Sequence, residues 1–295
     1  PLALAGAAFV RTHHLRSAPS RLAALTARAL GRRTAVTDHG LPGSDWAGLL
    51  PRLFDRFLAV SAYSARELGS PPKRTRVIYG GAAPERFRPG ADADRRGVLF
   101  VGRLTPHKGV EHLIAALPEN ATLRIAGSTG HDAVLPESDY PALLHRRAAG
   151  KDVRFLGPVV DRDLPELFRS AAVLVLPSVH QTCYGRTVKI SELLGLVLIE
   201  AMMSATPVIA SRLGGVPEVV QDGLTGYLVD PGDEGDLRDR LAALLGDPVR
   251  ARRMGRRARE LALERFTWQA CAERCLAAYG ELLGARRRWS PPSAR

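Results

Sequence analysis

The sequence predicts an α/β protein with two doubly wound domains, each a parallel sheet with helices on both faces. Short apolar runs such as VLFV (98–101) and VLVL (173–176) are typical of strands buried on both sides. Segments with helical periodicity separate these runs, and that alternation is characteristic of parallel sheets. A polar stretch at 86–97, with Arg, Pro and Gly, divides the alternation into two blocks, so we expect a linker there.

The first block is expected to contain four strands, at 7–12, 33–38, 57–61 and 74–80. Helical stretches are expected between them at 19–30, 46–54 and 62–68. The chain begins at Pro1, without a methionine and inside a strand-like run. We therefore expect an incomplete first domain.

The second block is expected to contain six strands, at 97–102, 121–127, 152–157, 171–177, 206–211 and 225–230. The helix after Gly109 should place Val110, Leu113, Ile114 and Leu117 on one buried face. From about 235 to Gly284 the pattern is helical, with Arg-rich outer faces.

The composition is that of a globular protein with a basic balance. The 295 residues carry a net charge of +12, which favours anionic partners such as small phosphates, anionic lipid or nucleic acid. Nucleic acid is the weakest of these, because aromatic residues make up only 6% and do not interleave with a basic run. No apolar run approaches the length of a membrane span. Three cysteines give no disulfide framework, so we expect a cytoplasmic protein.

Polar residues gather where ligands bind doubly wound sheets, just after the strands. Arg103 and Lys108 flank a strand-to-helix turn, where both can contact one phosphate group. Gly102 and Gly109 allow the backbone to approach that group closely. The alternative is a pair of solvated surface cations.

A second constellation follows the strand at 171–177. Gly195 would open a helix whose free N–H groups, from Gly195 through Leu196 to Val197, form an anion site. Glu200 lies about one turn into this apolar helix, where an unpaired carboxylate is costly unless a ligand binds it. A carboxylate is a good acceptor for a vicinal diol such as ribose. Glu192 would sit over the next ligand group; the alternative is a helix-start acid and a salt-bridged glutamate.

The spacing of Glu192 and Glu200, E-x7-E, resembles that of the retaining nucleotide-sugar glycosyltransferases of family 4 (group 1, GT-B fold). Four further stretches resemble this family in order: VIYGGAAPERFRP (77–89), VGRLTPHKG (101–109), TPVIASRLGGVPEVVQDGLTGYLVDPGD (206–233) and RFTWQACAERCLAAY (265–279). The resemblance is most specific over 97–283. It implies a partial acceptor-side domain over 1–90, a nucleotide-sugar-binding domain over 91–265, a helix over 266–284 that returns to the first domain, and a basic tail over 285–295.

The resemblance also implies residue roles. Arg103 and Lys108 would hold the diphosphate, and Glu192 would contact the hydroxyls of the donor sugar. The backbone from Gly102 and from Gly195 to Val197 would bind phosphate and sugar, and Glu200 would hold the ribose.

The first domain should contribute a histidine near the donor sugar. FVRTHHLRSAPS (9–20) resembles the corresponding segment of the family, and the alignment favours His13 over His14. A purely structural histidine is an equal alternative. Asp38 and His39 follow the next strand and would line the acceptor pocket, or form an ordinary turn.

One segment departs from the family pattern, since VHQTCYGRTVKIS (179–191) separates the strand end from Glu192. It is interpreted as a surface excursion or as an acceptor loop acting through His180, Tyr184 or Lys189. The triplets DRD (161–163) and DAD (92–94) are interpreted as helix starts or solvated acids, so no metal is expected.

These observations predict a retaining hexosyltransferase that uses a UDP- or GDP-sugar, an unknown acceptor, and neither metal nor other cofactor. A non-catalytic nucleotide-sugar-binding protein and a nucleotide-sugar epimerase of the same fold stay as alternatives. The tail ARRRWSPPSAR (285–295) is expected to be a frayed end, or to contact the inner membrane face peripherally.

Overall fold

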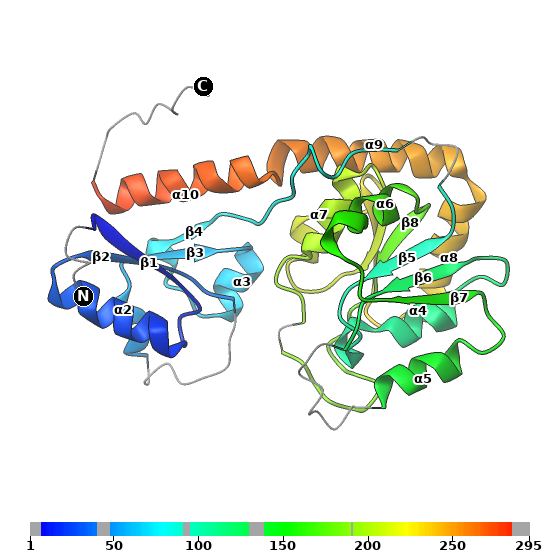
Figure 1. The fold of residues 1–295 in the computed structure, drawn as a ribbon, viewed down its shortest axis with the longest axis horizontal. Coiled ribbons are helices and arrows are strands. Elements are labelled where there is room, and N and C mark those ends of the chain that lie inside the picture. Colours follow the sequence, from blue (N-terminus) through cyan, green and yellow to red (C-terminus); the bar gives the residue numbers. More distant parts are fainter. Residues whose placement is uncertain (1–6, 40–47, 91–94, 130–138, 190, 285–295) are drawn as a thin grey trace. The chain divides into compact units, whose positions relative to one another are not determined.

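The computed structural model describes residues 7–39, 48–90, 95–129, 139–189 and 191–284. The chain folds into two compact units, which are described separately here. Unit 1 comprises residues 1–79 and 269–295, and unit 2 comprises residues 80–268. Their elements are labelled in Figure 1. The domain ranges expected from the sequence stay a prediction.

Unit 1 contains a four-stranded parallel sheet, and its strands are those that the sequence predicts. They are β1 (Phe9–His13), β2 (Arg33–Thr37), β3 (Arg56–Ala59) and β4 (Thr75–Val77), in that spatial order. Phe9 pairs with Arg33 in the register of the first two strands. Because all strands run in one direction, the residues after β1 and β2 meet at one edge, and His13 and Asp38 lie there.

Helices cover both faces of this sheet. On one face α2 (Ala18–Ala29) packs on β1 and β2, and Ser17 caps its first turn by accepting from the Ser20 N–H. The short helix α3 (Ala62–Glu67) is capped reciprocally by Ser61 and Ser64. On the other face α10 (Trp268–Leu282) buries Cys275 and Ala278 against Leu58 and Ile78.

The helix expected over 46–54 is wrong in its described part. Only a 3-10 turn is present there, η1 (Leu50–Leu53). Pro51 has no backbone N–H to donate to a longer helix, and Asp55, just after the turn, accepts from the Thr34 N–H of β2 at 2.8 Å. Leu50 and Phe54 are fully buried, so the short turn already places the apolar side chains in the core.

Unit 2 contains a six-stranded parallel sheet, and all six strands expected from the sequence are present. They are β5 (Val98–Val101), β6 (Leu123–Ala126), β7 (Val153–Gly157), β8 (Val173–Leu176), β9 (Val208–Ser211) and β10 (Gly226–Val229). Their spatial order is β10-β9-β8-β5-β6-β7, with the chain winding outward in both directions from β5 and β8. Such a doubly wound order opens a crevice at the carboxyl ends of the central strands.

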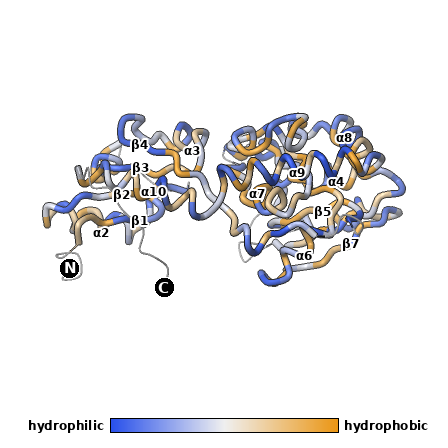
Figure 2. Tube along the Cα trace, turned by 90° about the horizontal axis from the view of Figure 1, so that it is seen from above, coloured by the Kyte–Doolittle hydropathy of each residue, from blue (hydrophilic) through white to orange (hydrophobic). Residues whose placement is uncertain are grey.

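Helices lie on both faces of this sheet, as the buried strands require (Figure 1). One face is covered by α4 (Val110–Ala116), α5 (Tyr140–Arg147) and α8 (Glu234–Gly246). The other is covered by α6 (Leu164–Arg169) and α7 (Leu196–Met203), and α9 (Pro248–Arg265) packs on α7. Val110, Leu113 and Ile114 are fully buried on one face of α4, which confirms the predicted apolar stripe. Figure 2 shows apolar residues recurring along the helices and strands of each unit, in alternation with polar ones.

The expected linker at 86–97 is not free where the structure describes it. Arg86 pairs with Asp161 at 2.7 Å, and Phe87 packs on Phe168 with ring centroids 5.7 Å apart. Arg95 donates to Thr206 Oγ1 at 2.6 Å. These side chains fasten the segment to unit 2, because its arginines find acceptors and its phenylalanine finds an apolar pocket. The prediction of a linker between domains is wrong for these residues.

Candidate functional site

The candidate site lies at the carboxyl edge of unit 2, by which we mean the loops that follow β5, β6, β7 and β8. Two of these loops touch through their backbones. The N–H of Gly102 donates to the Ala126 carbonyl at 3.0 Å, and a Cβ on Gly127 would lie 1.8 Å from the Gly102 oxygen. Gly127 also has a φ of 146°, which only glycine adopts easily. The Gly102 N–H is therefore engaged by Ala126, and the two glycines let these loops pack closely; that the Gly102 backbone contacts a ligand stays a prediction.

Arg103 lies at this edge as an exposed side chain. It borders a cavity of about 270 Å³ together with Gly102, Gly127 and Leu164. Among the residues that the structure describes, none forms a hydrogen bond or ion pair with the Arg103 guanidinium. A cation without a protein partner at the end of a buried strand suits a phosphate ligand.

Lys108 and Glu192 form a buried ion pair, which the sequence did not predict. Lys108 Nζ donates to Glu192 Oε1, which also accepts from Ser178 Oγ at 2.7 Å. The side chains of Lys108 and Glu192 are 14% and 8% exposed. Separating such a pair would leave a buried charge at a cost of several kcal/mol, on the order of 3–5. The pair fixes both side chains, and Ser178 is a site residue that sequence reasoning missed.

Gly109 explains how Lys108 reaches Glu192. Lys108 ends the 3-10 turn η4 (Pro106–Lys108), and Gly109 follows with a φ of 64°. A Cβ on Gly109 would lie 2.1 Å from the Pro177 carbonyl oxygen, so only glycine lets this turn approach the end of β8. The two segments of the site are thus held together through backbone contact.

His107 is a second residue that sequence reasoning missed. Its carbonyl accepts from the Val179 N–H at 2.9 Å and from Ser191 Oγ at 3.3 Å, which ties η4 to the segment before Glu192. Burial, followed by the charges of Lys108 and Arg103, lowers the pKa of His107 to about 4, with Glu192 opposing the decrease. The imidazole is therefore neutral at pH 7, and both cations lie near it.

Gly195 opens α7 as the sequence predicts. Its φ is 88°, and a Cβ there would lie 2.9 Å from Leu198 Cδ1. Within the described part of the chain, the backbone N–H groups of Leu196 and Val197 have no acceptor. Helix N–H groups of this kind attract anions, aided by the helix dipole.

Glu200 is half-buried, and its carboxylate has no cation within ion-pair distance among the described residues. Burial is the main cause that raises the pKa of Glu200 to about 7. Arg86 opposes this increase and Asp161 adds to it. Because Arg86 is already paired with Asp161, its charge compensates Glu200 only weakly. The carboxylate is left without a protein partner in the described structure.

The residues predicted from the first domain cluster in unit 1. His13 is exposed, and its Nδ1 lies 3.5 Å from His39 Nε2, with the two rings stacked. His14 adopts a φ of 62° and contacts the His39 ring. Burial, followed by neighbouring cationic groups, lowers the pKa values of His13 and His39. Asp38 is buried and accepts from the Leu15 N–H at 3.3 Å, so it holds the loop after β1.

The described part of segment 179–191 folds back on itself. Gln181 and Thr187 form an antiparallel bridge, and the Val188 N–H donates to the His180 carbonyl at 2.7 Å. Tyr184 donates to Asp139 at 2.6 Å. Lys189 is exposed. The choice between an acceptor loop and a surface excursion stays a prediction.

The remaining predictions concern metal and membrane. Asp161 to Asp163 form a 3-10 turn at the start of α6, and Asp161 pairs with Arg86. The triplet at 92–94 and the tail at 285–295 lie outside the described residues. Within the described ranges, no helix is both long and apolar enough to span a bilayer, and no three His, Cys, Asp or Glu residues are grouped for a metal ion.

Comparisons with known proteins agree on one family. Residues 82–261 match the family model for glycosyl transferases group 1. The chain is 38% identical over 202 residues to alpha-maltose-1-phosphate synthase of Mycolicibacterium smegmatis, covering 64% of this chain and 49% of that protein. It is 35% identical over 252 residues to D-inositol 3-phosphate glycosyltransferase of Nocardia farcinica, covering 78% and 53%. The chain thus spans about half the length of the curated relatives it matches.

Solved structures agree on the fold. Sucrose-phosphate synthase from Thermosynechococcus elongatus matches with a TM-score of 0.75 and 27% identity, over 95% of this chain and 75% of that chain. HepE from Anabaena, solved with UDP and glucose, matches with a TM-score of 0.71 and 22% identity, over 87% and 74%. The fold is therefore GT-B, with its two Rossmann-like sheets. Together with the family match over 82–261, this places the chain in the glycosyl transferases group 1 family.

Proposed function

We propose that this chain is a retaining glycosyltransferase that binds a UDP- or GDP-sugar at the carboxyl edge of unit 2. The observation that carries the proposal is the gathering of the buried Lys108–Glu192 pair, the unpaired Arg103 and the open amides of α7 at one edge of one sheet. A diphosphate needs such cations and amides, and a sugar needs such a carboxylate.

The cations have separate tasks in this proposal. The ammonium of Lys108 has three donors, so it can hold Glu192 and still donate to a phosphate oxygen. Arg103 supplies a charge that no described carboxylate neutralises. Together with the α7 amides these groups stabilise the charge that develops on the departing diphosphate.

The reaction is a sugar transfer with retention at the anomeric carbon. The bond from that carbon to the diphosphate oxygen breaks, and a bond to the acceptor oxygen forms on the same face. The acceptor proton passes to a phosphate oxygen of the departing nucleotide, so the step balances without a separate protein base or a covalent sugar–protein intermediate. We propose no metal, because Arg103, Lys108 and the α7 amides supply the charge stabilisation. His13 is proposed to contact the donor sugar from unit 1.

Glu200 is proposed to hold the ribose of the nucleotide. Its carboxylate has no described ion-pair partner and is easily protonated near neutral pH. Two ribose hydroxyls would donate to the ionised form and replace the lost hydration, since a buried carboxylate is stabilised by donors.

The relatives suggest the acceptor class to test first. Two of them carry names that refer to D-inositol 3-phosphate and to maltose-1-phosphate, and a neighbouring structure carries a title with UDP-glucose. We therefore propose a phosphorylated sugar or polyol as the acceptor and UDP-glucose as the first donor to test.

The proposal is tested by calorimetry with UDP and GDP, followed by a transfer assay. The assay supplies UDP-glucose with D-inositol 3-phosphate or with unphosphorylated inositol, and the anomeric configuration of the product is read by NMR. Nucleotide binding that Lys108→Ala weakens, together with an α-linked product, supports the proposal.

Three results would count against it. Absence of nucleotide binding removes the donor site. Binding without transfer to any acceptor favours the non-catalytic binding protein. A changed donor sugar in the absence of acceptor favours the epimerase.

A further inference from the structure

A second cavity lies at the amino edge of the unit 2 sheet, by which we mean the residues just before β5, β6, β8 and β9. Its volume is about 390 Å³, within the range of cavities that hold small molecules. Gly97, Thr122, Ala172 and Pro207 border it, and each lies immediately or closely before one of these strands. Because the strands are parallel, this cavity is at the opposite end of the sheet from Arg103 and Lys108.

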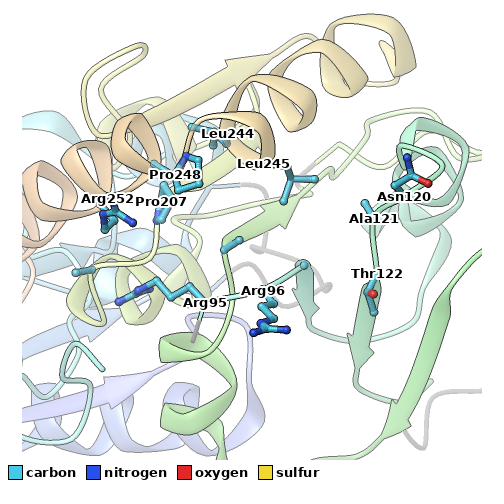
Figure 3. Close-up of a pocket in the computed structure, with 14 residues that line it drawn as sticks. Arg95, Arg96, Asn120, Ala121, Thr122, Pro207, Leu244, Leu245, Pro248 and Arg252 are labelled. Atoms are coloured by element: carbon cyan, nitrogen blue, oxygen red, sulfur yellow. The ribbon is translucent and has the colours of Figure 1, made fainter. Parts of the chain in front are cut away.

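The charge around this cavity has one sign in the described structure. Arg95, Arg96 and Arg252 border it, and none of the described lining residues is acidic. Figure 3 shows these arginines with Leu244 and Leu245 around the cavity. The arginines border the cavity from two sides, Arg95 and Arg96 from the segment before β5 and Arg252 from α9, while the leucines and prolines make the lining between them apolar (Figure 3).

Two acids close to the cavity, Asp247 and Asp152, are already engaged, and Glu119 is exposed beside Asn120 without bordering the cavity itself. Asp247 caps α9 by accepting from the Arg250 N–H at 2.9 Å. Asp152 accepts from Thr122 and also pairs with Arg154 at 3.3 Å. None of these acids borders the cavity, so none neutralises the arginines from within its lining.

The position of one of the three arginines, Arg95, is explained by a hydrogen bond at a helix end. Arg95 donates to the Ser204 carbonyl at 2.7 Å, just after the end of α7, as cations near helix ends often do. The guanidiniums of Arg96 and Arg252 have no such acceptor within the described residues. Their positions at the cavity are not explained by the fold.

We propose that the amino-edge cavity binds a phosphate monoester with a small apolar body. Arg96 and Arg252 would contact the phosphate, because guanidinium groups match phosphate oxygens in charge and geometry. Leu244, Leu245 and Pro248 would contact the apolar body. This site is independent of the proposed donor site, from which the whole sheet separates it.

The test uses phenyl phosphate, inorganic phosphate and phenol as probes, with binding measured by calorimetry on the full chain. We expect phenyl phosphate to bind most tightly and phenol not to bind. Arg96→Glu and Arg252→Glu should each weaken phenyl phosphate binding by at least about tenfold, since each removes a charged hydrogen bond. Arg253→Glu is the matched control, because Arg253 is exposed next to Arg252 and does not border the cavity.

The variants also separate this site from the donor site. Arg103→Glu should leave phenyl phosphate binding unchanged. A second assay pellets the protein with phosphatidylcholine vesicles that contain phosphatidic acid. If pelleting depends on Arg96 and Arg252, the same site binds a lipid phosphate instead of a soluble one. Unchanged melting temperatures of the four variants serve as the folding control.

Four outcomes overturn the proposal. The first is that phenyl phosphate does not bind to the unmodified chain, and the second is that phenol binds as tightly as phenyl phosphate. The third is that Arg253→Glu weakens binding as much as Arg252→Glu does. The fourth is that Arg103→Glu abolishes binding while both cavity variants keep it.

Discussion

The two edges of the unit 2 sheet are built from the same strands but differ in chemistry. At the carboxyl edge, glycines let backbones touch, and Lys108, Glu192 and Ser178 form a buried polar group. At the amino edge, arginines border an apolar cavity. The larger cavity, about 390 Å³ against 270 Å³, lies at the amino edge. The proposed donor site is thus assigned to the edge with the smaller cavity, because the buried charged groups lie there.

Among changes at the carboxyl edge, Lys108→Ala should have the largest effect on turnover and on stability. It should lower turnover by about 10²–10³-fold, because the cation proposed to stabilise the leaving diphosphate is lost. It should also reduce the free energy of unfolding by roughly 3–5 kcal/mol, because Glu192 is left buried and unpaired. Turnover at saturating substrates and urea unfolding measure the two effects.

The double variant Lys108→Met, Glu192→Gln separates these effects. Ser178 can still donate to the glutamine, so most of the stability should return while turnover stays low. If turnover recovers together with stability, Lys108 acts only as a structural partner of Glu192.

Gly127→Ala tests the close backbone contact of the carboxyl edge. The new Cβ would lie 1.8 Å from the Gly102 oxygen at a φ of 146°, so we expect a loss of about 2–4 kcal/mol in the free energy of unfolding. The control is Gly246→Ala at the end of α8, next to Leu245 of the amino-edge cavity, where nothing lies within 4 Å of the new Cβ. That variant should be neutral or stabilised by up to about 1 kcal/mol. Equal effects of the two changes would contradict the contrast between the edges.

Glu200→Gln tests the pH dependence of the carboxyl edge. The pKa of Glu200 is raised from 4.5 to about 7, so its stabilising contribution is complete below 4.5 and is lost as pH rises through about 7. At pH 8 the variant should therefore be more stable than the unmodified chain by roughly 1–3 kcal/mol. Thermal unfolding between pH 5 and 8 measures this difference.

Nucleotide binding should show the opposite trend. Ribose hydroxyls would donate to the ionised carboxylate, so the affinity of the unmodified chain for UDP-glucose, which has no terminal phosphate that titrates near pH 7, should rise as pH increases through about 7. In Glu200→Gln this pH dependence should disappear. A variant that keeps the same pH profile would show that another group titrates.

Arg103→Ala has the smallest expected effect on stability. Arg103 is exposed and has no described partner, so the free energy of unfolding should change by less than about 0.5 kcal/mol. The affinity for UDP should fall by about tenfold, because a charged hydrogen bond to phosphate is lost. Arg252→Ala, at the amino edge, should leave UDP affinity unchanged. Equal loss in both variants would mean that the cations act through net charge alone.

The strands and most helices could be predicted from the sequence because their patterns are local. VLVL at 173–176 is buried on both faces as its apolar run predicts, and Gly195 opens α7 as its position before an apolar helix predicts. The helix expected at 46–54 failed because Asp55 bonds to Thr34, a partner twenty-one residues away. The linker at 86–97 failed for a similar reason, since Arg86 and Arg95 bond to groups much later in the chain.

The sequence by itself determined the alternating fold, the family, and the candidate residues after the strands, since each depends on residue type and short spacing. Tertiary structure alone decided that Lys108 pairs with Glu192, that Glu200 lacks an ion-pair partner among the described residues, and that three arginines surround a cavity at the amino edge. These features depend on which distant segments meet, and burial then sets the cost of each charge.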